Sequence, residues 1–151
     1  MSASVQWKID PVREVEQLNK AVRNKVIRIA MNKASAPVKA SVVDNARKRH
    51  GYLKKSIRIR LRNYQDKAVW VSVLGPKRDF YKRKGKYKRG PKRGQFKWHR
   101  PSNYARLLER GTKHASAKPF LKPALLSTQS RFATVLQQSI REQIAAQLPK
   151  S

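Results

Sequence analysis

The sequence predicts an α+β fold with a long N-terminal helix, a small antiparallel sheet, a short helix and a long C-terminal helix. Near both ends of the chain, apolar residues recur every three or four positions, which is the period of a helix. Between them, two neighbouring segments carry the apolar pattern of strands. A chain of 151 residues suits about one domain. We therefore expect a single domain over residues 1–151, with its helices packed on one face of the sheet and a basic loop or arm at about 77–100.

The first helix is expected to begin at about Pro11, which suits a first helical turn, with Asp10 able to cap it. An apolar stripe follows and continues towards Ala46. Pro37 interrupts it, and either kinks one long helix or starts a second one. The sequence leaves both alternatives open. The first part of the stripe consists of Val15, Leu18, Val22, Val26 and Ile29.

The strand pair is expected at residues 55–62 and 68–74. The first segment alternates apolar and basic side chains, and the second is rich in β-branched and aromatic residues before Gly75 and Pro76 end it. The five residues 63–67 suit a turn, so the two segments most simply form an antiparallel hairpin. One face of this hairpin would then present three outward basic side chains. These are Arg58, Arg60 and Arg62.

The last third of the chain predicts two helices. A short one, capped by Ser102 or Asn103, would end at Gly111. Its apolar side would comprise Tyr104, Leu107 and Leu108. A long one would run from about Pro123 to Gln147. The apolar stripe of this second helix consists of Leu125, Phe132, Val135, Leu136, Ile140, Ile144 and Leu148.

Charge and composition exclude most catalytic classes. The chain has 37 Lys and Arg against 8 Asp and Glu, a net charge of +29, so we expect a polyanion or an acidic partner to neutralise it. It has no cysteine and only three histidines, so thiol chemistry is excluded and metal or acid–base chemistry is poorly supplied. We expect no enzyme, no cofactor, no metal and no membrane partner. His50, His99 and His114 are interpreted as polar turn residues.

The basic arm, residues 77–100, is the strongest candidate for a binding surface. Twelve of its 24 residues are Lys or Arg, Asp79 is its one acid, and no helical or strand period organises it. It is interpreted as a long mobile loop or a loose hairpin. Nucleic-acid contact, a protein partner and a passive solvated loop all remain open for it. The residues expected to contact nucleic acid are Lys82, Arg83, Lys84, Lys86, Lys88, Arg89, Lys92, Arg93, Lys97 and Arg100.

Two motifs in the second half of the chain resemble those of a known family. Residues 104–112 read Tyr-Ala-Arg-Leu-Leu-Glu-Arg-Gly-Thr, and residues 117–125 read Ala-Lys-Pro-Phe-Leu-Lys-Pro-Ala-Leu. Upstream, residues 51–57 read Gly-Tyr-Leu-Lys-Lys-Ser-Ile, and residues 73–76 read Val-Leu-Gly-Pro. This order resembles the head–tail joining, or tail-completion, family of tailed bacteriophages. The sequence departs from the family at His50, where threonine is usual, and in the longer and more basic segment 77–100.

The resemblance implies a structural protein of the virion neck or tail, made in the host cytoplasm and assembled as a ring between head portal and tail. Its partners would be further copies of itself and other neck, portal or tail proteins, with genomic DNA as a further candidate. The alternative is a free nucleic-acid-binding protein of ribosomal or packaging type, which charge alone suggests. The motif residues, expected to be structural or interfacial, are Gly51, Leu53, Gly75, Tyr104, Leu108, Gly111, Pro119, Phe120, Leu121 and Pro123.

Overall fold

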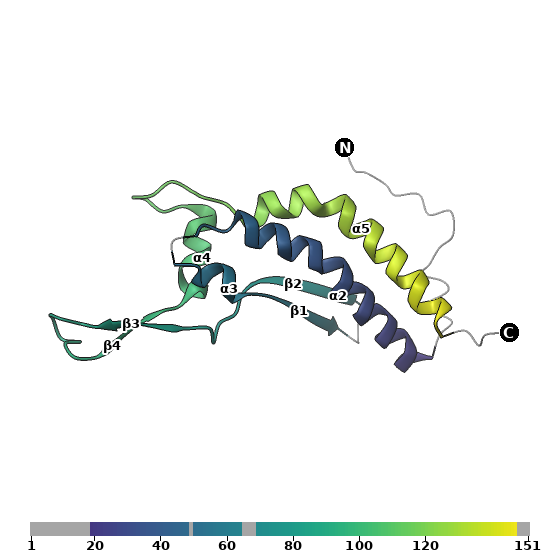
Figure 1. Cartoon of the computed structure of the whole chain (residues 1–151), viewed down its shortest axis with the longest axis horizontal. Helices are drawn as coiled ribbons and strands as arrows, with labels where there is room; N and C mark the ends of the chain where they lie inside the picture. Colours follow the sequence, from purple (N-terminus) through teal and green to yellow (C-terminus); the bar gives the residue numbers. More distant parts are fainter. Residues whose placement is uncertain (1–18, 49, 65–68, 148–151) are drawn as a thin grey trace.

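The computed structural model describes residues 19–48, 50–64 and 69–147, and it confirms the predicted α+β class. The expected helix start at Pro11, the turn residues 65–67 and Leu148 lie outside these ranges. Within them, the elements follow one another from a long helix to a long helix (Figure 1). They are α2 (Lys20–Asn45), α3 (Tyr52–Ser56), β1 (Ile57–Tyr64), β2 (Val69–Pro76), β3 (Lys82–Lys86), β4 (Phe96–His99), α4 (Pro101–Arg110) and α5 (Leu121–Ala145).

Helices α2 and α5 pack side by side in opposite directions (Figure 1). At one end, Val42 and Ala46 of α2 share a buried cluster with Phe120 and Ala124, where α5 begins. At the other end, Val26 of α2 packs against the last turns of α5. Small buried side chains between these clusters let the two backbones approach closely. The pair therefore forms the spine of the described structure.

Pro37 lies inside α2, which continues through it as one helix. A proline nitrogen has no hydrogen to donate to the carbonyl of the preceding turn, so this position weakens the helix locally. Ala34 and Val38 are buried on either side of it, at 0% and 8% exposure. Their packing holds the backbone in helical form across the proline. Tertiary contacts thus decide between the alternatives of one helix and two.

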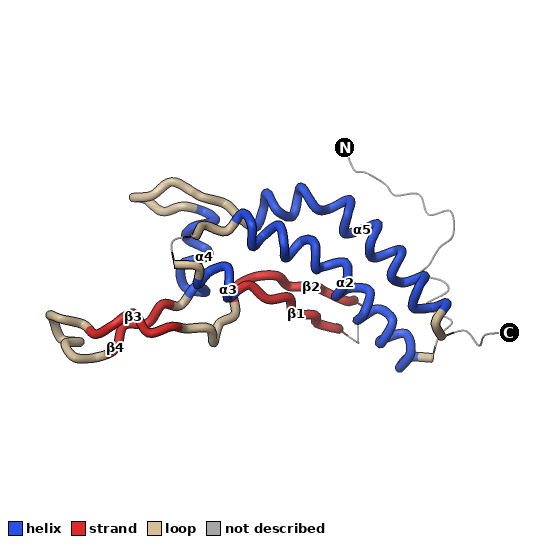
Figure 2. The backbone as a smooth tube through the Cα atoms, viewed as in Figure 1, coloured by secondary structure: helices blue, strands red, loops and turns tan. Residues whose placement is uncertain are grey.

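The β1–β2 hairpin packs against α2 on the side away from α5, so α2 is the middle layer of three (Figures 1 and 2). The strands are antiparallel, with Arg60 opposite Val73. The hydroxyl oxygens of Ser35 and Ser72 lie 2.7 Å apart and join α2 to β2. The row Arg58, Arg60 and Arg62 is exposed on the outer face, as predicted.

β1 lies two residues further along the chain than expected, and β2 begins one residue later and ends two residues later. The predicted range 55–62 begins two residues early because Ser56 belongs to the short helix α3. The Ser56 hydroxyl donates a hydrogen bond of 2.7 Å to the Leu53 carbonyl, and the side chain is fully buried. A single turn of helix held by such a local bond leaves no periodic pattern in the sequence.

Helix α4 differs from its prediction in two ways. It begins at Pro101 after Arg100, and neither Ser102 nor Asn103 caps it. Leu107 is 51% exposed, because Pro101 and Ala105 form the buried side of this helix.

Helix α5 matches its predicted bounds within two residues, but Leu125 does not belong to its buried face. This side chain is 58% exposed, since Ala124 takes the position that faces the core.

Candidate nucleic-acid interface: the basic arm and its root

The basic arm is an ordered antiparallel hairpin that extends away from the helices (Figure 2). Lys82 of β3 pairs with His99 of β4, and Lys86 pairs with Phe96. An irregularity between Arg83 and Gly85 shifts the register by one residue. The interpretation as a loop without regular structure is therefore wrong, and the alternative of a hairpin is right. The sequence period is hidden because a bulge changes which residues share a face.

The end of the hairpin is closed by backbone hydrogen bonds and glycines. Tyr87 donates to the Gln95 carbonyl at 2.9 Å, and Gly94 donates to the Tyr87 carbonyl at 2.9 Å. Gly90 and Gly94 have φ of 81° and 83°, which a residue with a side chain adopts only with strain. The glycines of residues 87–95 thus allow a tight turn, although the high charge of this segment suggests disorder.

The aromatic rings of the arm are covered by its own cations. The Arg83 guanidinium lies 4.1 Å from the centre of the Phe96 ring and 6.0 Å from that of Trp98. The Lys97 ammonium lies 4.7 Å from the centre of the Tyr87 ring. Tyr81 meets Trp98 edge-on, with ring centres 5.2 Å apart. These contacts hold cations in place on the arm and occupy ring faces that could otherwise stack on bases.

The ten residues predicted to contact nucleic acid are distributed over the whole arm. Lys82, Arg83, Lys84 and Lys86 lie on β3, which is exposed along its length. Lys88, Arg89, Lys92 and Arg93 lie in the turn, Lys97 lies half-buried on β4, and Arg100 precedes α4.

The acid of the arm, Asp79, is neutralised locally. Its carboxylate lies 2.7 Å from the Lys77 ammonium. The hydrogen bond from Lys77 is the main cause that lowers the pKa of Asp79. The arm therefore presents almost pure positive charge to a partner.

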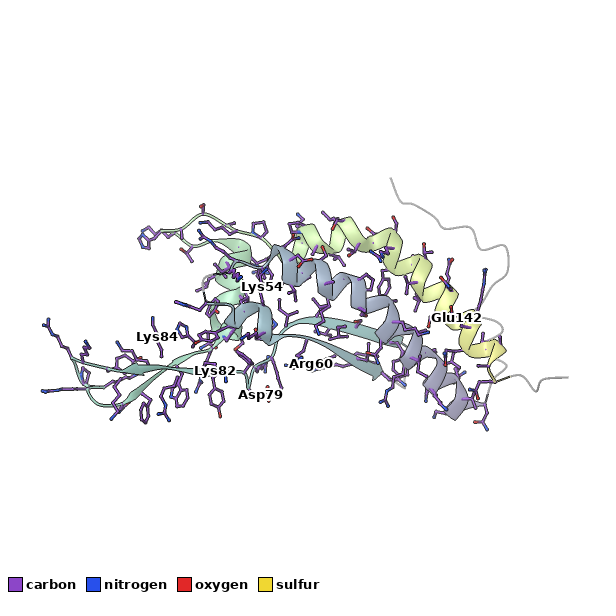
Figure 3. The ribbon with its side chains drawn as sticks, in the orientation of Figure 1. Lys54, Arg60, Asp79, Lys82, Lys84 and Glu142 are labelled. Carbon is purple, nitrogen blue, oxygen red and sulfur yellow. The ribbon has the colours of Figure 1, made fainter. Side chains whose placement is uncertain are left out.

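A cavity lies where the arm joins the body, and sequence reasoning missed it. It has a volume of about 730 Å³ and is bounded by the segment that follows α2, by α3, by the arm and by α4. We call it the root cavity. Lys84 extends from β3 on the side that faces α3 and α4 (Figure 3). The residues that line the cavity are Arg47, Lys48, His50, Gly51, Tyr52, Leu53, Lys84, His99, Tyr104 and Leu108.

Three rings from two segments of the chain gather in the root cavity. The ring centres of His50 and His99 lie 5.3 Å apart, and that of Tyr52 lies 5.2 Å from His99. The interpretation of His50 and His99 as plain turn residues is therefore incomplete, whereas His114 lies in an exposed turn as expected. Only the fold reveals this cluster, because 49 positions separate the two histidines in the chain.

The family-motif residues lie in three places, and some of them share the first two. Gly51, Leu53, Tyr104 and Leu108 line the root cavity. Leu53 and Phe120 are buried in the main core cluster, and Tyr104, Leu108 and Leu121 pack against it. Gly75 lies opposite Arg58 in the hairpin, while Pro119 and Pro123 are exposed beside the start of α5.

Glu109 has a structural role that the sequence analysis did not predict. Its carboxylate accepts backbone hydrogen bonds from Phe120, Leu121 and Lys122 at 2.9, 3.0 and 2.9 Å. It thereby caps the start of α5, where Phe120 offers no capping side chain. Partial burial raises the pKa of Glu109, but the three hydrogen bonds and the charge of Lys122 outweigh it and leave the pKa lowered. The two halves of the motif are joined through this carboxylate.

Gly111 ends α4 with φ 77° and ψ −178°. The helix ends at Gly111 as predicted, and the φ is positive, but the ψ value is extended, so the residue is not in the left-handed helical region that commonly ends a helix. Such a conformation is open almost only to glycine. A Cβ at this position would lie 2.8 Å from the backbone nitrogen of Ala117 and 3.0 Å from the Ala115 carbonyl oxygen. Glycine is therefore required here for two independent reasons.

Residues 19–48, 50–64 and 69–147 hold no group of three or more acidic, histidine or cysteine side chains arranged to hold a metal ion. Among the helices that the structure describes, none has the length and apolar character needed to cross a membrane.

Comparison with known proteins gives one match. The model of the family described as "Bacteriophage HK97-gp10, putative tail-component" matches residues 12–111, which is more than half of the chain. The matched range includes the basic arm, the root cavity and Glu109, and ends before the Pro119–Pro123 motif. The comparisons with curated proteins and with solved structures give no match.

Proposed function

Because this chain belongs to the HK97-gp10-like family of phage tail components, we propose that it is a structural, non-catalytic protein of the virion neck. In this role it completes the tail or joins it to the head, forms a ring there, and places the basic arm against the DNA that passes through the neck. It would be made in the host cytoplasm and enter the virion with other neck, portal or tail proteins.

The exposed, purely cationic hairpin carries the DNA part of the proposal. All five residues of β3 are exposed, and Asp79 is already paired with Lys77. Since cations cover the rings of Phe96, Trp98 and Tyr87, the arm offers charge rather than free stacking faces. This favours the phosphates of duplex DNA over the bases of a single strand, and predicts binding without sequence preference.

Open strand edges support the ring part of the proposal. Each of the two described sheets has two strands, so every strand has one edge without a partner strand in the subunit. Open edges favour pairing with another chain. In a ring, each subunit would offer its edge to a neighbour, which requires different surfaces on the two sides of the subunit. Counting the copies in the assembled particle tests this part, and a single copy would refute it.

The DNA contact is tested by removing charge from the arm alone. The test variant replaces Lys82, Lys88, Arg89, Lys92 and Arg93 with Ser, and leaves in place Lys84 and the cations that cover rings. The control variant replaces five exposed cations of α2 and α5 with Ser. These are Lys25, Arg28, Lys122, Arg131 and Arg141.

The measurement is the affinity for a short DNA duplex at several salt concentrations. Each lost phosphate contact should reduce the slope of log affinity against log salt by about 0.9. We expect the arm variant to flatten the slope and the control to change it less. An unchanged slope in the arm variant would refute DNA contact. Phage particles that carry the arm variant and still retain their genome normally would show the arm to be a passive hairpin.

The alternative, a free nucleic-acid-binding protein, rests on the net charge of +29. It predicts the same salt slope but a different location. Detection of the protein in purified, nuclease-treated particles would exclude it, and its absence from such particles would exclude the neck role.

A further inference from the structure

The root cavity is lined by cations. The residues of the described ranges that line it include Arg47, Lys48 and Lys84, together with the imidazoles of His50 and His99, and none of them is Asp or Glu. Leu53, Tyr104 and Leu108 add apolar surface to its wall. A partner that fits this lining carries carboxylates beside apolar side chains, and is narrow enough to enter a space of about 730 Å³. A DNA duplex is too broad for such a hollow, whereas a peptide segment fits.

The acids that the structure describes are largely engaged within the subunit. Asp79 pairs with Lys77, and Glu142 pairs with Lys33 at 3.1 Å. Glu109 caps α5. The fourth described acid, Asp44, is exposed on the last turn of α2, so the described body has little further acidic surface to offer to a neighbouring copy.

The acids of the chain are concentrated in one short segment instead. Residues 10–16 read Asp-Pro-Val-Arg-Glu-Val-Glu and contain three of the eight acids, Asp10, Glu14 and Glu16. We call this the acidic segment, and it lies outside the described residues. Its valines alternate with its acids, so it combines carboxylates with apolar side chains, as the root cavity requires.

Chain geometry keeps Glu14 and Glu16, two of the three carboxylates of the acidic segment, out of the cavity of their own subunit. A helix rises about 1.5 Å per residue, so α2 places Asn45 about 38 Å from Lys20. The cavity begins beyond that end, at Arg47. Glu16 precedes Lys20 by four residues, and a fully extended chain spans at most about 3.6 Å per residue, so its reach is about 14 Å. Even Asp10, ten residues before Lys20, reaches only about 36 Å.

We propose that the root cavity of each subunit receives the acidic segment of a neighbouring copy. The acidic segment precedes α2 in the chain and the cavity follows its end, so donor and acceptor are different parts of the subunit and the contact is head-to-tail, repeating from one subunit to the next. It gives a chain of net charge +29 a way to associate with itself despite repulsion. The inference rests on the proposed function only in that the head-to-tail series of subunits closes into a ring. The contact between two subunits can be measured without a ring.

The first experiment titrates the full-length protein into a fluorescent synthetic peptide of residues 6–18 and follows its anisotropy. The cavity variant carries Lys48→Glu and Lys84→Glu. The matched control carries Lys88→Glu and Lys92→Glu, the same charge change in the turn of the arm. We expect about tenfold weaker binding for the cavity variant, from two reversed ion pairs, and little change for the control. Equal weakening in both variants would reduce the contact to general charge attraction and overturn the proposal.

A charge swap makes the assignment specific. A peptide with Glu14→Lys and Glu16→Lys should bind the wild-type protein weakly and regain affinity for the cavity variant. A scrambled peptide of the same composition that binds as well as the natural one would overturn the proposal. A further result would also overturn it: the peptide does not bind, and the cavity variant, but not the control, loses binding to a DNA duplex. That result would assign the cavity to DNA.

The second experiment uses the absence of cysteine from the chain. A variant with Glu16→Cys and Lys84→Cys, gently oxidised at high concentration, should give a ladder of disulfide-linked oligomers, because each subunit both donates and accepts. The pair Glu16→Cys and Lys88→Cys is the control and should give little product. An internally linked monomer, or equal ladders from both pairs, would overturn the proposal. If the peptide binds but the virion contains a single copy of this protein, the ring is refuted, whereas the binding of the acidic segment to the root cavity is not.

Discussion

The carboxylate of Glu109 should be the most important polar group for the stability of this fold. It accepts three backbone hydrogen bonds at the start of α5, and the donor residue Phe120 is only 1% exposed. Leaving a buried donor without a partner costs about 1–3 kcal/mol, and losing a helix cap costs about 0.5–2 kcal/mol. We therefore expect Glu109→Ala to lower the free energy of unfolding by about 2–4 kcal/mol at pH 7.

Glu109→Gln removes the negative charge of this side chain and keeps its size, so it measures the contribution of the charge alone. The amide keeps one acceptor oxygen but loses the negative charge beside the positive end of α5, so the expected loss is about 1–2 kcal/mol. The pKa of Glu109 is lowered from an ordinary value of 4.5. A carboxylate with a lowered pKa stabilises the folded state above its unfolded-state pKa and loses that effect as the pH falls through the folded-state pKa. The penalty of Glu109→Gln should thus be full at pH 7 and shrink below about pH 4.5.

Urea denaturation followed by circular dichroism at pH 7 and pH 4 measures both effects. Glu142→Gln is the matched control, because Glu142 also has a lowered pKa, caused first by its hydrogen bond from Lys33, but lies exposed on α5. We expect it to lose less than Glu109→Gln. If Glu109→Gln unfolds at the same urea concentration as the wild type at pH 7, the carboxylate does not hold the start of α5. A penalty that grows on acidification would contradict the sign of the pKa argument.

Two further substitutions test the backbone and the core. Gly111→Ala should destabilise the fold by at least about 2 kcal/mol, since alanine would carry the strain of φ 77° and meet the Ala117 nitrogen at 2.8 Å; wild-type behaviour in urea would refute the required glycine. Ser139→Ala should stabilise the fold by about 1 kcal/mol, because the Ser139 hydroxyl is buried and has no hydrogen-bond partner within the part of the chain that the structure describes. A lower melting temperature for that variant would show that the hydroxyl has a partner after all.

Local patterns were sufficient for the elements whose stability is mainly local or periodic. The stripe along α5 predicts its bounds within two residues, and the alternation around Arg60 predicts both the β1–β2 hairpin and its outward basic row. Periodicity works in these places because each element buries one face against a single neighbour. Composition and motif order likewise indicate a phage tail component, in agreement with the family match to residues 12–111.

Other features depend on contacts between residues far apart in the sequence. Pro37 stays inside one helix because α2 is packed on two sides, and the basic arm forms a hairpin because its bulge and ring contacts organise charges that would otherwise repel. The Glu109 cap and the root cavity bring together groups that no spacing rule connects. The sequence by itself determined α5, the apolar stripe of α2, the first hairpin and the charge. Only the tertiary structure decided which polar groups meet, because a polar contact leaves no periodic trace in the chain.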